Sequence, residues 1–234
     1  MCLRRILYNN RISDELDLII VSLGNRQRPE EQIDIYEIPY RNNELIIHSG
    51  KYKPYIREFE FIAKNKYLIP EINKWLSGSG KLDIEDDYKY YTQDGYYNVS
   101  VVEGWEYELY TNHMYQFIVK FKIEPFYYYN SGNLIKTITS PSQIYNPGTI
   151  YSEPYIKINA SGNVDLSINS NVISFTNIEE YIEIDSSLMT VYKDTINQGE
   201  RMQGEFPIFN TDKNYISWNG NVSSIQIKGR WREL

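Results

Sequence analysis

The chain has 234 residues, a length that accommodates two domains, and its 41% hydrophobic and 24% charged residues are typical of a folded protein. Its net charge is −7, with 17 basic against 20 acidic residues up to Lys136 and 7 against 11 after it, so neither half carries the basic excess that nucleic-acid binders use. The single cysteine, Cys2, excludes an internal disulfide, and the most apolar stretch, residues 16–23, is far too short to cross a membrane, so we expect neither nucleic-acid nor membrane binding.

The first half of the chain is dominated by strand patterns. Tyrosine occurs 23 times, and aromatic side chains favour pleated, half-buried surfaces. Residues 115–124 alternate apolar and polar side chains almost without exception, and residues 58–64 and 97–101 do the same. These segments predict half-buried antiparallel strands. No signal peptide is expected, because the polar residues 8–11 interrupt the apolar start.

One short helix is predicted near residues 70–76. Pro70 suits the first turn of a helix and Glu71 favours its positive end. Leu68, Ile72, Trp75 and Leu76 would lie on one face, and Ser77-Gly78 would end the helix. So short a helix needs a sheet to pack on.

A domain boundary is predicted near residue 135, where tyrosines give way to a stretch rich in Ser, Pro and Gly. The sequence therefore divides into residues 1–135 and 136–234. In the second part, alternating residues on both sides of Ser161-Gly162-Asn163 predict one hairpin, and those around Asn219-Gly220 predict another. Short strands at this spacing favour a β-sandwich.

The sequence offers little material for catalysis or metal binding. His48 and His113 lie far apart, and the run from Ser77 to Lys81 follows a helix and has Leu82 where a phosphate loop needs Ser or Thr. An acidic cluster could in principle serve glycoside hydrolysis or bind calcium, but contiguous carboxylates usually form a solvated loop, and the spacing of a calcium loop is missing. That cluster consists of Asp83, Glu85, Asp86 and Asp87. We expect no catalytic, metal-binding or cofactor-binding residues, and no cofactor.

Several aromatic residues leave a second interpretation open. Exposed rings could stack on sugars, whereas buried rings would pack cores or subunit contacts, which is the more common use of aromatic residues. The residues concerned are Trp105, Trp218, Trp231 and Tyr127 to Tyr129.

A series of short motifs runs in order along almost the whole chain. In the first half these are Ile38-Pro39-Tyr40-Arg41, Tyr55-Ile56-Arg57-Glu58-Phe59, Trp75-Leu76 followed by Leu82, Tyr96-Tyr97-Asn98-Val99, and Phe121-Lys122-Ile123-Glu124-Pro125-Phe126. In the second half these are Asn146-Pro147-Gly148-Thr149, Pro154-Tyr155-Ile156-Lys157-Ile158, Ser161-Gly162-Asn163, Ile184-Asp185-Ser186 with Met189, Gly204-Glu205-Phe206-Pro207, Trp218-Asn219-Gly220 and Arg230-Trp231-Arg232. In order and spacing the chain resembles the siphophage distal tail protein (Dit) family.

The resemblance implies a mostly β fold and a structural role. Residues 1–135 would form a β-sandwich or split barrel with one short helix that closes into a homohexameric ring, and residues 136–234 a galectin-like β-sandwich arm. The ring would join the tail tube protein to the tail-associated tip protein and to baseplate or receptor-binding proteins. The protein would be a virion component at the tail tip, assembled in the host cytoplasm, and not an enzyme.

Some residues are expected to determine the fold or the domain junction, with Pro125 ending a strand there. These residues are Trp75, Leu76, Pro125, Asp185, Gly204, Phe206, Pro207, Trp218 and Trp231. Two rival functions stay open at this point: a module that binds cell-wall sugars through exposed aromatic residues, and a hydrolase that uses the acidic cluster.

Overall fold

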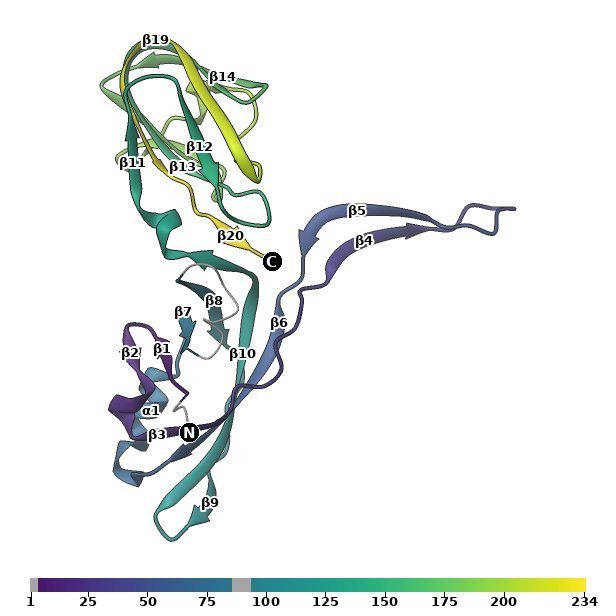
Figure 1. Ribbon diagram of the computed structural model, residues 1–234, viewed down its shortest axis with the longest axis vertical. Helices are drawn as coiled ribbons and strands as arrows, with labels where there is room; N and C mark the ends of the chain where they lie inside the picture. Colours follow the sequence, from purple (N-terminus) through teal and green to yellow (C-terminus); the bar gives the residue numbers. More distant parts are fainter. Residues whose placement is uncertain (1–3, 86–93) are drawn as a thin grey trace. The chain divides into compact units, whose positions relative to one another are not determined.

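The computed structural model describes residues 4–85 and 94–234, which form two compact units (Figure 1). The first unit holds nearly all of the described chain up to Tyr127, and the second runs from Tyr128 to Glu233 with a few residues around Asp94. The change of unit falls inside a long strand, earlier in the chain than residue 135. The roles assigned to the two parts of the chain stay predictions.

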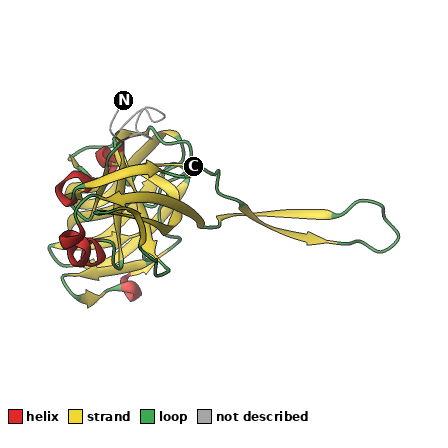
Figure 2. Ribbon diagram, turned by 90° about the horizontal axis from the view of Figure 1, so that it is seen from below, coloured by secondary structure: helices red, strands yellow, loops and turns green. Residues whose placement is uncertain are grey.

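The first unit is built from a curled antiparallel sheet and a separate two-stranded ribbon. In the described part of the chain, the sheet has the strand order β2-β1-β7-β8-β10-β6-β3, and β9 pairs with β10 off this path. In the ribbon, β4 and β5 pair with each other (Figure 2). The elements are β1 (Ile6–Tyr8), β2 (Arg11–Ile12), β3 (Leu18–Ser22), β4 (Glu31–Tyr36), β5 (Leu45–Tyr52), β6 (Tyr55–Ala63), α1 (Ile69–Trp75), β7 (Ser79–Ile84), β8 (Gly95–Val101), β9 (Glu108–Thr111) and β10 (Met114–Tyr129).

The core of the first unit lies on one face of β6 and β10. The two strands pair without a break from Tyr115 opposite Ala63 to Ile123 opposite Tyr55. Because successive side chains of a strand point to opposite faces, one parity on each strand is buried and the other faces outward. The buried aromatic rings and valine are Phe59, Phe61, Phe117, Val119 and Phe121. The strands expected at 58–64, 97–101 and 115–124 are confirmed, as is the mostly β fold class.

The predicted helix is also confirmed. In α1, Pro70 lies in the first turn, and Ile72, Trp75 and the following Leu76 are buried. The indole Nε1–H of Trp75 donates to the carbonyl of Tyr8 at 2.9 Å, which ties the helix to β1. Gly78, at φ 73°, lets the chain turn directly into β7.

The second unit is an antiparallel sheet with the order β11-β19-β13-β15-β16-β17 in the described residues, and β12 and β14 extend it off this path. Alternate isoleucines of β13 and β19 lie on the buried side and form one apolar core with residues of β12, β14 and β15. The strands are β11 (Ile135–Ile138), β12 (Ser142–Asn146), β13 (Tyr155–Ile168), β14 (Asn171–Ile178), β15 (Tyr181–Asp185), β16 (Thr190–Lys193), β17 (Ile196–Asn197), β18 (Met202–Gln203), β19 (Asp212–Lys228) and β20 (Arg232–Glu233).

The two hairpins predicted in this unit are wrong. The chain runs straight through Ser161-Gly162-Asn163 as β13 and through Asn219-Gly220 as β19, and the two strands pair with each other from Tyr155 opposite Lys228 to Ile168 opposite Ile216. The register shifts between Ser161 and Val164. Gly162, at φ 82°, lies in this β-bulge of β13, and Gly220, at φ 109°, lies opposite it on β19, so both glycines supply unusual backbone at the bulge instead of a turn.

The prediction that Pro125 ends a strand is also wrong, because β10 continues through it to Tyr129. Proline lacks an N–H, so it is tolerated where no ladder hydrogen bond is required. The register of β10 with β6 ends at Ile123, before Pro125, so the proline removes no bond on that side.

The close approach of Gly220 to the bulge of β13 makes a first prediction. A Cβ at this position would lie 2.4 Å from the carbonyl oxygen of Asn163, at a φ that L side chains rarely adopt. We expect Gly220→Ala to lower the free energy of unfolding by about 2 kcal/mol or more, measured by urea denaturation. Gly104→Ala is the matched control, because a Cβ there meets nothing within 4 Å, and it should change stability by less than about 0.5 kcal/mol. Equal effects of the two substitutions would refute the prediction.

Candidate assembly surface

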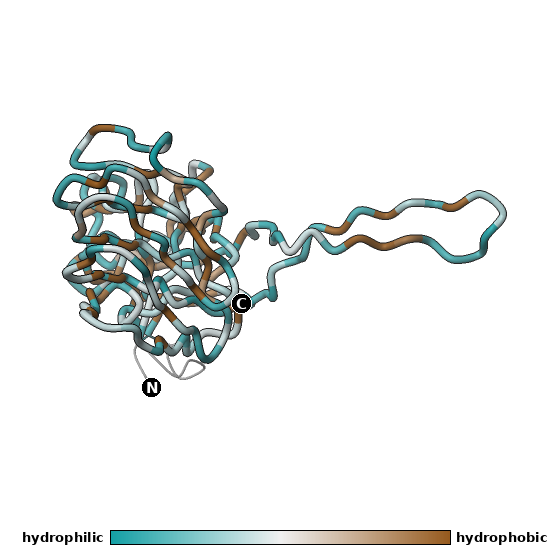
Figure 3. Tube along the Cα trace, turned by 90° about the horizontal axis from the view of Figure 1, so that it is seen from above, coloured by the Kyte–Doolittle hydropathy of each residue, from teal (hydrophilic) through white to brown (hydrophobic). Residues whose placement is uncertain are grey.

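The β4–β5 hairpin carries the largest group of exposed apolar side chains among the described strands of the first unit. Ile35 lies opposite Ile46 and Tyr36 opposite Leu45, so neighbouring pairs present their side chains to opposite faces of the ribbon. Apolar stretches occur on both strands (Figure 3). Six large side chains on the ribbon are between 42% and 54% exposed: Ile33, Ile35, Tyr36, Leu45, Ile46 and Ile47.

The two faces of the hairpin are both apolar but differ in composition. One face, which we call the isoleucine face, carries Ile33, Ile35 and Ile46. The other, which we call the mixed face, carries Tyr36, Leu45 and Ile47, with Asp34 opposite Ile47. A two-stranded hairpin that buries neither face is marginally stable at best in water. We therefore expect another protein surface to cover this hairpin.

The base of the hairpin is held by polar contacts. The N–H of Lys53 donates to the carbonyl of Glu30 at 2.8 Å, and the Nζ of Lys53 lies 3.1 Å from a carboxylate oxygen of Glu30. At the next residue of the chain, Oε2 of Glu31 lies 3.0 Å from Nδ1 of His48 on β5, and this hydrogen bond lowers the pKa of Glu31. The ring of Tyr52 packs edge-on against Phe126, 5.9 Å between centroids. These contacts fix where the ribbon leaves the sheet.

The loop at the end of the hairpin displays one aromatic ring completely. Tyr40 is fully exposed and has φ 65°, a conformation that costs a non-glycine residue about 1 kcal/mol. The N–H of Arg41 donates to the carbonyl of Ile38 at 3.1 Å and closes the turn. The loop thus presents a tyrosine in a constrained backbone.

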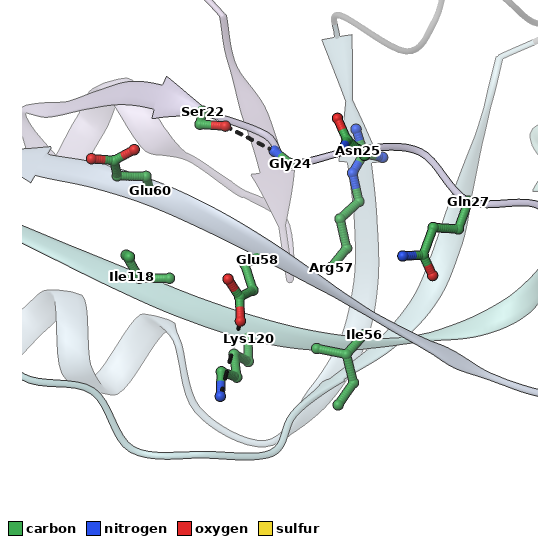
Figure 4. A pocket seen from close by; sticks show the side chains of 10 residues that line it. All are labelled: Ser22, Gly24, Asn25, Gln27, Ile56, Arg57, Glu58, Glu60, Ile118 and Lys120. Carbon is green, nitrogen blue, oxygen red and sulfur yellow. Dashed lines mark hydrogen bonds and ion pairs between the residues drawn. The ribbon is translucent and has the colours of Figure 1, made fainter.

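A groove of about 570 Å³ lies on the outward face of the same unit (Figure 4). Its floor is formed by β6 and β10, where Ile56 and Ile118 are each 47% exposed. Its wall is the segment from Ser22 to Gln27, which leads from β3 toward the hairpin. Glu58, Glu60 and Lys120 lie on the same face of these two strands, so the lining is mostly polar and suits a protein surface better than a small apolar ligand.

Two features make the groove rigid. Arg57 is 4% exposed, and its Nε–H donates to the carbonyl of Leu23 at 2.6 Å, which anchors the wall to the sheet. Gly24 has φ 63°, and a Cβ there would lie 2.5 Å from the carbonyl oxygen of Glu58. Between Ile56 and Ile118 on this face, the Nζ of Lys120 lies 2.8 Å from Oε2 of Glu103 and 4.0 Å from Oε1 of Glu58. These contacts attach the wall of the groove to the sheet.

An ion pair joins two segments of the second unit that are far apart in the chain. Asp185, at the end of β15, accepts two hydrogen bonds of 2.6 Å from the guanidinium of Arg230 and one of 3.1 Å from the N–H of Leu188. Burial by itself would raise the pKa of Asp185, but the hydrogen bonds and charge of Arg230 lower it below its ordinary value. Asp185 was expected to determine the fold, and these contacts are those of a structural residue.

The other singled-out residues of the second unit pack within it. Gly204 has φ 121°, and its Cα approaches the backbone of Val172 and Ile173. Phe206, Trp218 and Trp231 pack against the apolar core of the unit, and Pro207 is buried beside Phe206. In the first unit, Trp75 and Leu76 anchor α1 as described above. The role of all these residues as fold determinants stays a prediction.

The aromatic residues considered for sugar stacking are not exposed. Trp105 lies over Phe117, Trp231 lies 5.7 Å from Phe209, and Tyr127 and Tyr129 are 3% and 1% exposed. Trp218 and Tyr128 are half-buried. The fully accessible rings are other ones, with Tyr40 and Tyr67 the most exposed.

Two tyrosine hydroxyls of the second unit have raised pKa values. Burial and a hydrogen bond to Glu183 raise the pKa of Tyr155, and a hydrogen bond to Asp194 raises the pKa of Tyr181 to about 12. Both hydroxyls therefore stay protonated at neutral pH and do not serve as bases. Among residues 4–85 and 94–234, no three His, Cys, Asp or Glu side chains lie together as metal ligands. Of the acidic cluster, Asp83 ends up in β7 beside Glu85, and Asp86, Asp87 and also Cys2 lie outside the described residues.

Comparison with known proteins gives one informative result. No family model and no curated protein matches the sequence. A solved structure does match: the Dit protein of phage SPP1, described as a paradigm of the hub adsorption apparatus in phages that infect Gram-positive bacteria. The TM-score is 0.71 at 10% sequence identity, over 96% of this chain and 98% of the SPP1 chain. The likeness establishes a shared fold over both units. No helix in the described residues is long and apolar enough to span a membrane.

The Asp185–Arg230 pair makes a second prediction. Because the folded state lowers the pKa of Asp185, the pair stabilises the protein above the ordinary aspartate pKa, and that contribution is lost as pH falls through the lowered value. We expect Asp185→Asn to reduce the free energy of unfolding by about 2 kcal/mol at pH 7, since Arg230 would stay partly buried without its charged partner. The difference in free energy of unfolding between wild type and Asp185→Asn should narrow in acid, below pH 3.8.

Urea denaturation at a series of pH values measures both effects. Glu205→Gln, at an exposed position of the same unit, controls for the loss of one negative charge. A gap between wild type and Asp185→Asn that stays constant down to the lowest accessible pH would show that the ion pair is not its source.

Proposed function

We propose that this protein is a structural, non-enzymatic subunit of a phage tail tip that assembles with copies of itself. The observation that carries the proposal is the two-faced apolar hairpin, which extends from a unit that also offers a groove with Ile56 and Ile118 among polar side chains. The shared fold with a phage hub protein over almost the whole chain gives this surface its context. No arrangement of groups in the described residues competes with assembly as the use of these surfaces.

The hairpin and the groove are different patches on the same unit. A contact in which the hairpin of one copy enters the groove of the next is heterologous, and heterologous contacts close into rings when the rotation between copies allows it. The first unit would form such a ring, a homohexamer, and the second unit would be an arm with a galectin-like sandwich. The ring provides a hub around which a tail can be joined.

The partners of such a hub follow from its place at the end of a tail. The tail tube protein would dock on one side of the ring, and a tail-associated tip protein, with baseplate or receptor-binding proteins, on the other. The protein would reside in the virion at the tail tip after assembly in the host cytoplasm. Sugar binding finds less support, because the aromatic residues that would have carried it are buried or half-buried.

Removal of the hairpin tests the proposal directly. Glu30 and Lys53 are hydrogen-bonded neighbours, so an Asn-Gly turn can join them in place of residues 31–52 without disturbing the sheet. We expect the wild-type chain to form rings, seen by electron microscopy and by light scattering coupled to size-exclusion chromatography, and the shortened chain to stay monomeric. Its melting temperature should be close to that of the wild type, because the removed side chains are not part of the core.

A surface control separates loss of the hairpin from loss of apolar surface in general. Val172→Ser removes a side chain that is 57% exposed on the second unit and should leave assembly unchanged. Rings formed by the shortened chain at the same concentrations as the wild type would count against the proposal, as would a wild-type chain that never assembles.

A further inference from the structure

The second unit has two outward-facing sheet surfaces, and the one on β13, β15 and β16 is engaged in contacts of its own. The hydroxyl of Tyr155 donates to Oε2 of Glu183 at 2.7 Å, and the Nζ of Lys157 lies 3.5 Å from Oε1 of the same carboxylate. The Nζ of Lys157 also lies 3.6 Å from the ring centroid of Tyr181, whose hydroxyl donates to Asp194. The tyrosines and charges of this surface therefore satisfy one another.

The other surface has a different composition. It lies on the outward side of β12, β19, β13 and β14, which pair in this order (Figure 1). Gln143 lies opposite Tyr215, and Ser217 lies opposite Ser167, so the registers bring these side chains to one side of the sheet. We call this surface the neutral face, and it is formed by Gln143, Tyr145, Ser167, Tyr215, Ser217 and Asn219.

Charged residues lie only in the two end rows of the neutral face. Asp165 lies in the row of Asn219 at one end, and its Oδ1 accepts a hydrogen bond of 2.6 Å from the hydroxyl of Ser174. Lys213 lies opposite Tyr145 in the row at the other end. The rows between them are uncharged, in a chain of which 24% of the residues are charged.

Two exposed tyrosines stand on the neutral face in fixed positions. Tyr145 is 57% exposed and Tyr215 is 60% exposed. The N–H of Asn169 donates to the carbonyl of Tyr215 at 2.8 Å, and the N–H of Tyr215 donates to Oδ1 of Asn169 at 3.0 Å. Nδ2 of Asn169 in turn donates to Oδ1 of the buried Asn214 at 2.9 Å. The hydroxyl of Tyr145 donates to Oδ1 of Asp212 at 3.4 Å. The rings are thus positioned before any ligand arrives.

The middle of the neutral face is short and polar. Ser217 and Ser167 lie opposite each other there, and the exposed side chains of Gln143 and Asn219 lie on either side of them along the strands. Hydroxyl and amide side chains both donate and accept hydrogen bonds. A ligand that rests on the serines would meet aromatic rings at one end and mixed donors and acceptors along its length.

These properties match a neutral carbohydrate. A sugar ring presents C–H groups on its faces and hydroxyls around its edge, so it requires an apolar ring with a wet polar end and partners that both donate and accept. Phosphates and carboxylates are recognised by charge-assisted hydrogen bonds from Arg or Lys, and the middle rows of this face provide no cation.

A protein partner matches the neutral face less well. Four strands about 4.8 Å apart and about five residues at 3.4 Å each cover roughly 19 Å by 17 Å, or about 320 Å². One side of a stable interface buries about 800 Å², more than twice that area. The cores of protein interfaces are also depleted in serine, which forms the middle of this face.

We propose that the neutral face of the second unit binds a neutral oligosaccharide. Tyr145 and Tyr215 stack on sugar rings, and Gln143, Ser217 and Asn219 hydrogen-bond to sugar hydroxyls. These tyrosines are not among the aromatic residues that the sequence singled out for sugar stacking, which are buried or half-buried. The binding is separate from self-association, because the hairpin and the groove belong to the first unit.

Titration of the full-length protein with tetrasaccharides tests this site. The probes are maltotetraose, cellotetraose and chitotetraose, which are neutral, and tetragalacturonate, which is anionic. Saturation-transfer NMR detects binding, and calorimetry measures its strength. We expect at least one neutral tetrasaccharide to bind and tetragalacturonate to bind more weakly than it. Tyr215→Ala should weaken binding by about tenfold because a stacking ring is lost, while Tyr215→Phe keeps the ring and most of the affinity.

Two further variants control for loss of folding and for general surface effects. Ser217→Arg places a long charged side chain in the middle of the face, keeps both tyrosines and should abolish binding without a change in melting temperature. Tyr110→Ala removes a ring that is 57% exposed, like that of Tyr145, but on the first unit, and should bind like the wild type. The proposal is overturned if no neutral tetrasaccharide binds at about 10 mM, or if Tyr215→Ala and Ser217→Arg bind as tightly as the wild type.

Light scattering on the same variants separates this site from the proposed function. Tyr215→Ala and Ser217→Arg should assemble like the wild type. Loss of assembly in these two variants would show that the neutral face is a contact between copies, which overturns the carbohydrate site. A wild-type chain that binds a neutral tetrasaccharide but never assembles would refute the proposed function and leave this site intact.

Discussion

The register between β6 and β10 is the constraint on which the rest of the first unit depends. It places Phe59, Phe61, Phe117 and Phe121 inside and leaves the opposite parity, with Ile56 and Ile118, outside. A slip by one residue would exchange the two sets, because successive side chains of a strand alternate between faces. The stacked rings inside make such a slip very costly, so the core that stabilises the sheet also determines which side chains form the groove floor.

In the second unit, strand pairing also determines the shape of the sheet, through the two long strands β13 and β19. β13 and β19 are so long that a flat pair would not cover a core, and the bulge at Gly162, opposite Gly220, bends the ladder instead of ending it. The Asp185–Arg230 pair then fixes the end of β15 to the segment that follows β19. Curvature and closure in this unit thus come from two glycines and one ion pair, while the isoleucines supply the burial energy.

Local patterns predicted the strands of the first unit and α1, because alternation and helix-end signals act within a few residues. They misjudged Gly162 and Gly220, since glycine in an alternating segment suits a turn and a bulge equally well, and only the pairing of β13 with β19 decides between them. In the candidate surface, the sequence patterns did not predict the hairpin, even though Ile33 and Ile35 alternate with polar neighbours before the loop at Pro39 and Tyr40. Alternation predicts a strand, but not that neither face is covered within the chain. The groove joins segments that are far apart in sequence, so no local pattern reveals it.

An exposed apolar ribbon is a hazard for a protein that must stay soluble before it assembles. The hairpin carries its own protection: Asp34 interrupts the mixed face, the Glu31–His48 pair flanks the isoleucine face, and Glu37, Arg41 and Glu44 surround the loop. With a net charge of −7 on each copy, random encounters are repulsive at long range. Only a partner whose apolar surface matches the ribbon in length and shape gains enough contact to offset that repulsion, so the charges that keep the free chain soluble also restrict its contacts to specific ones.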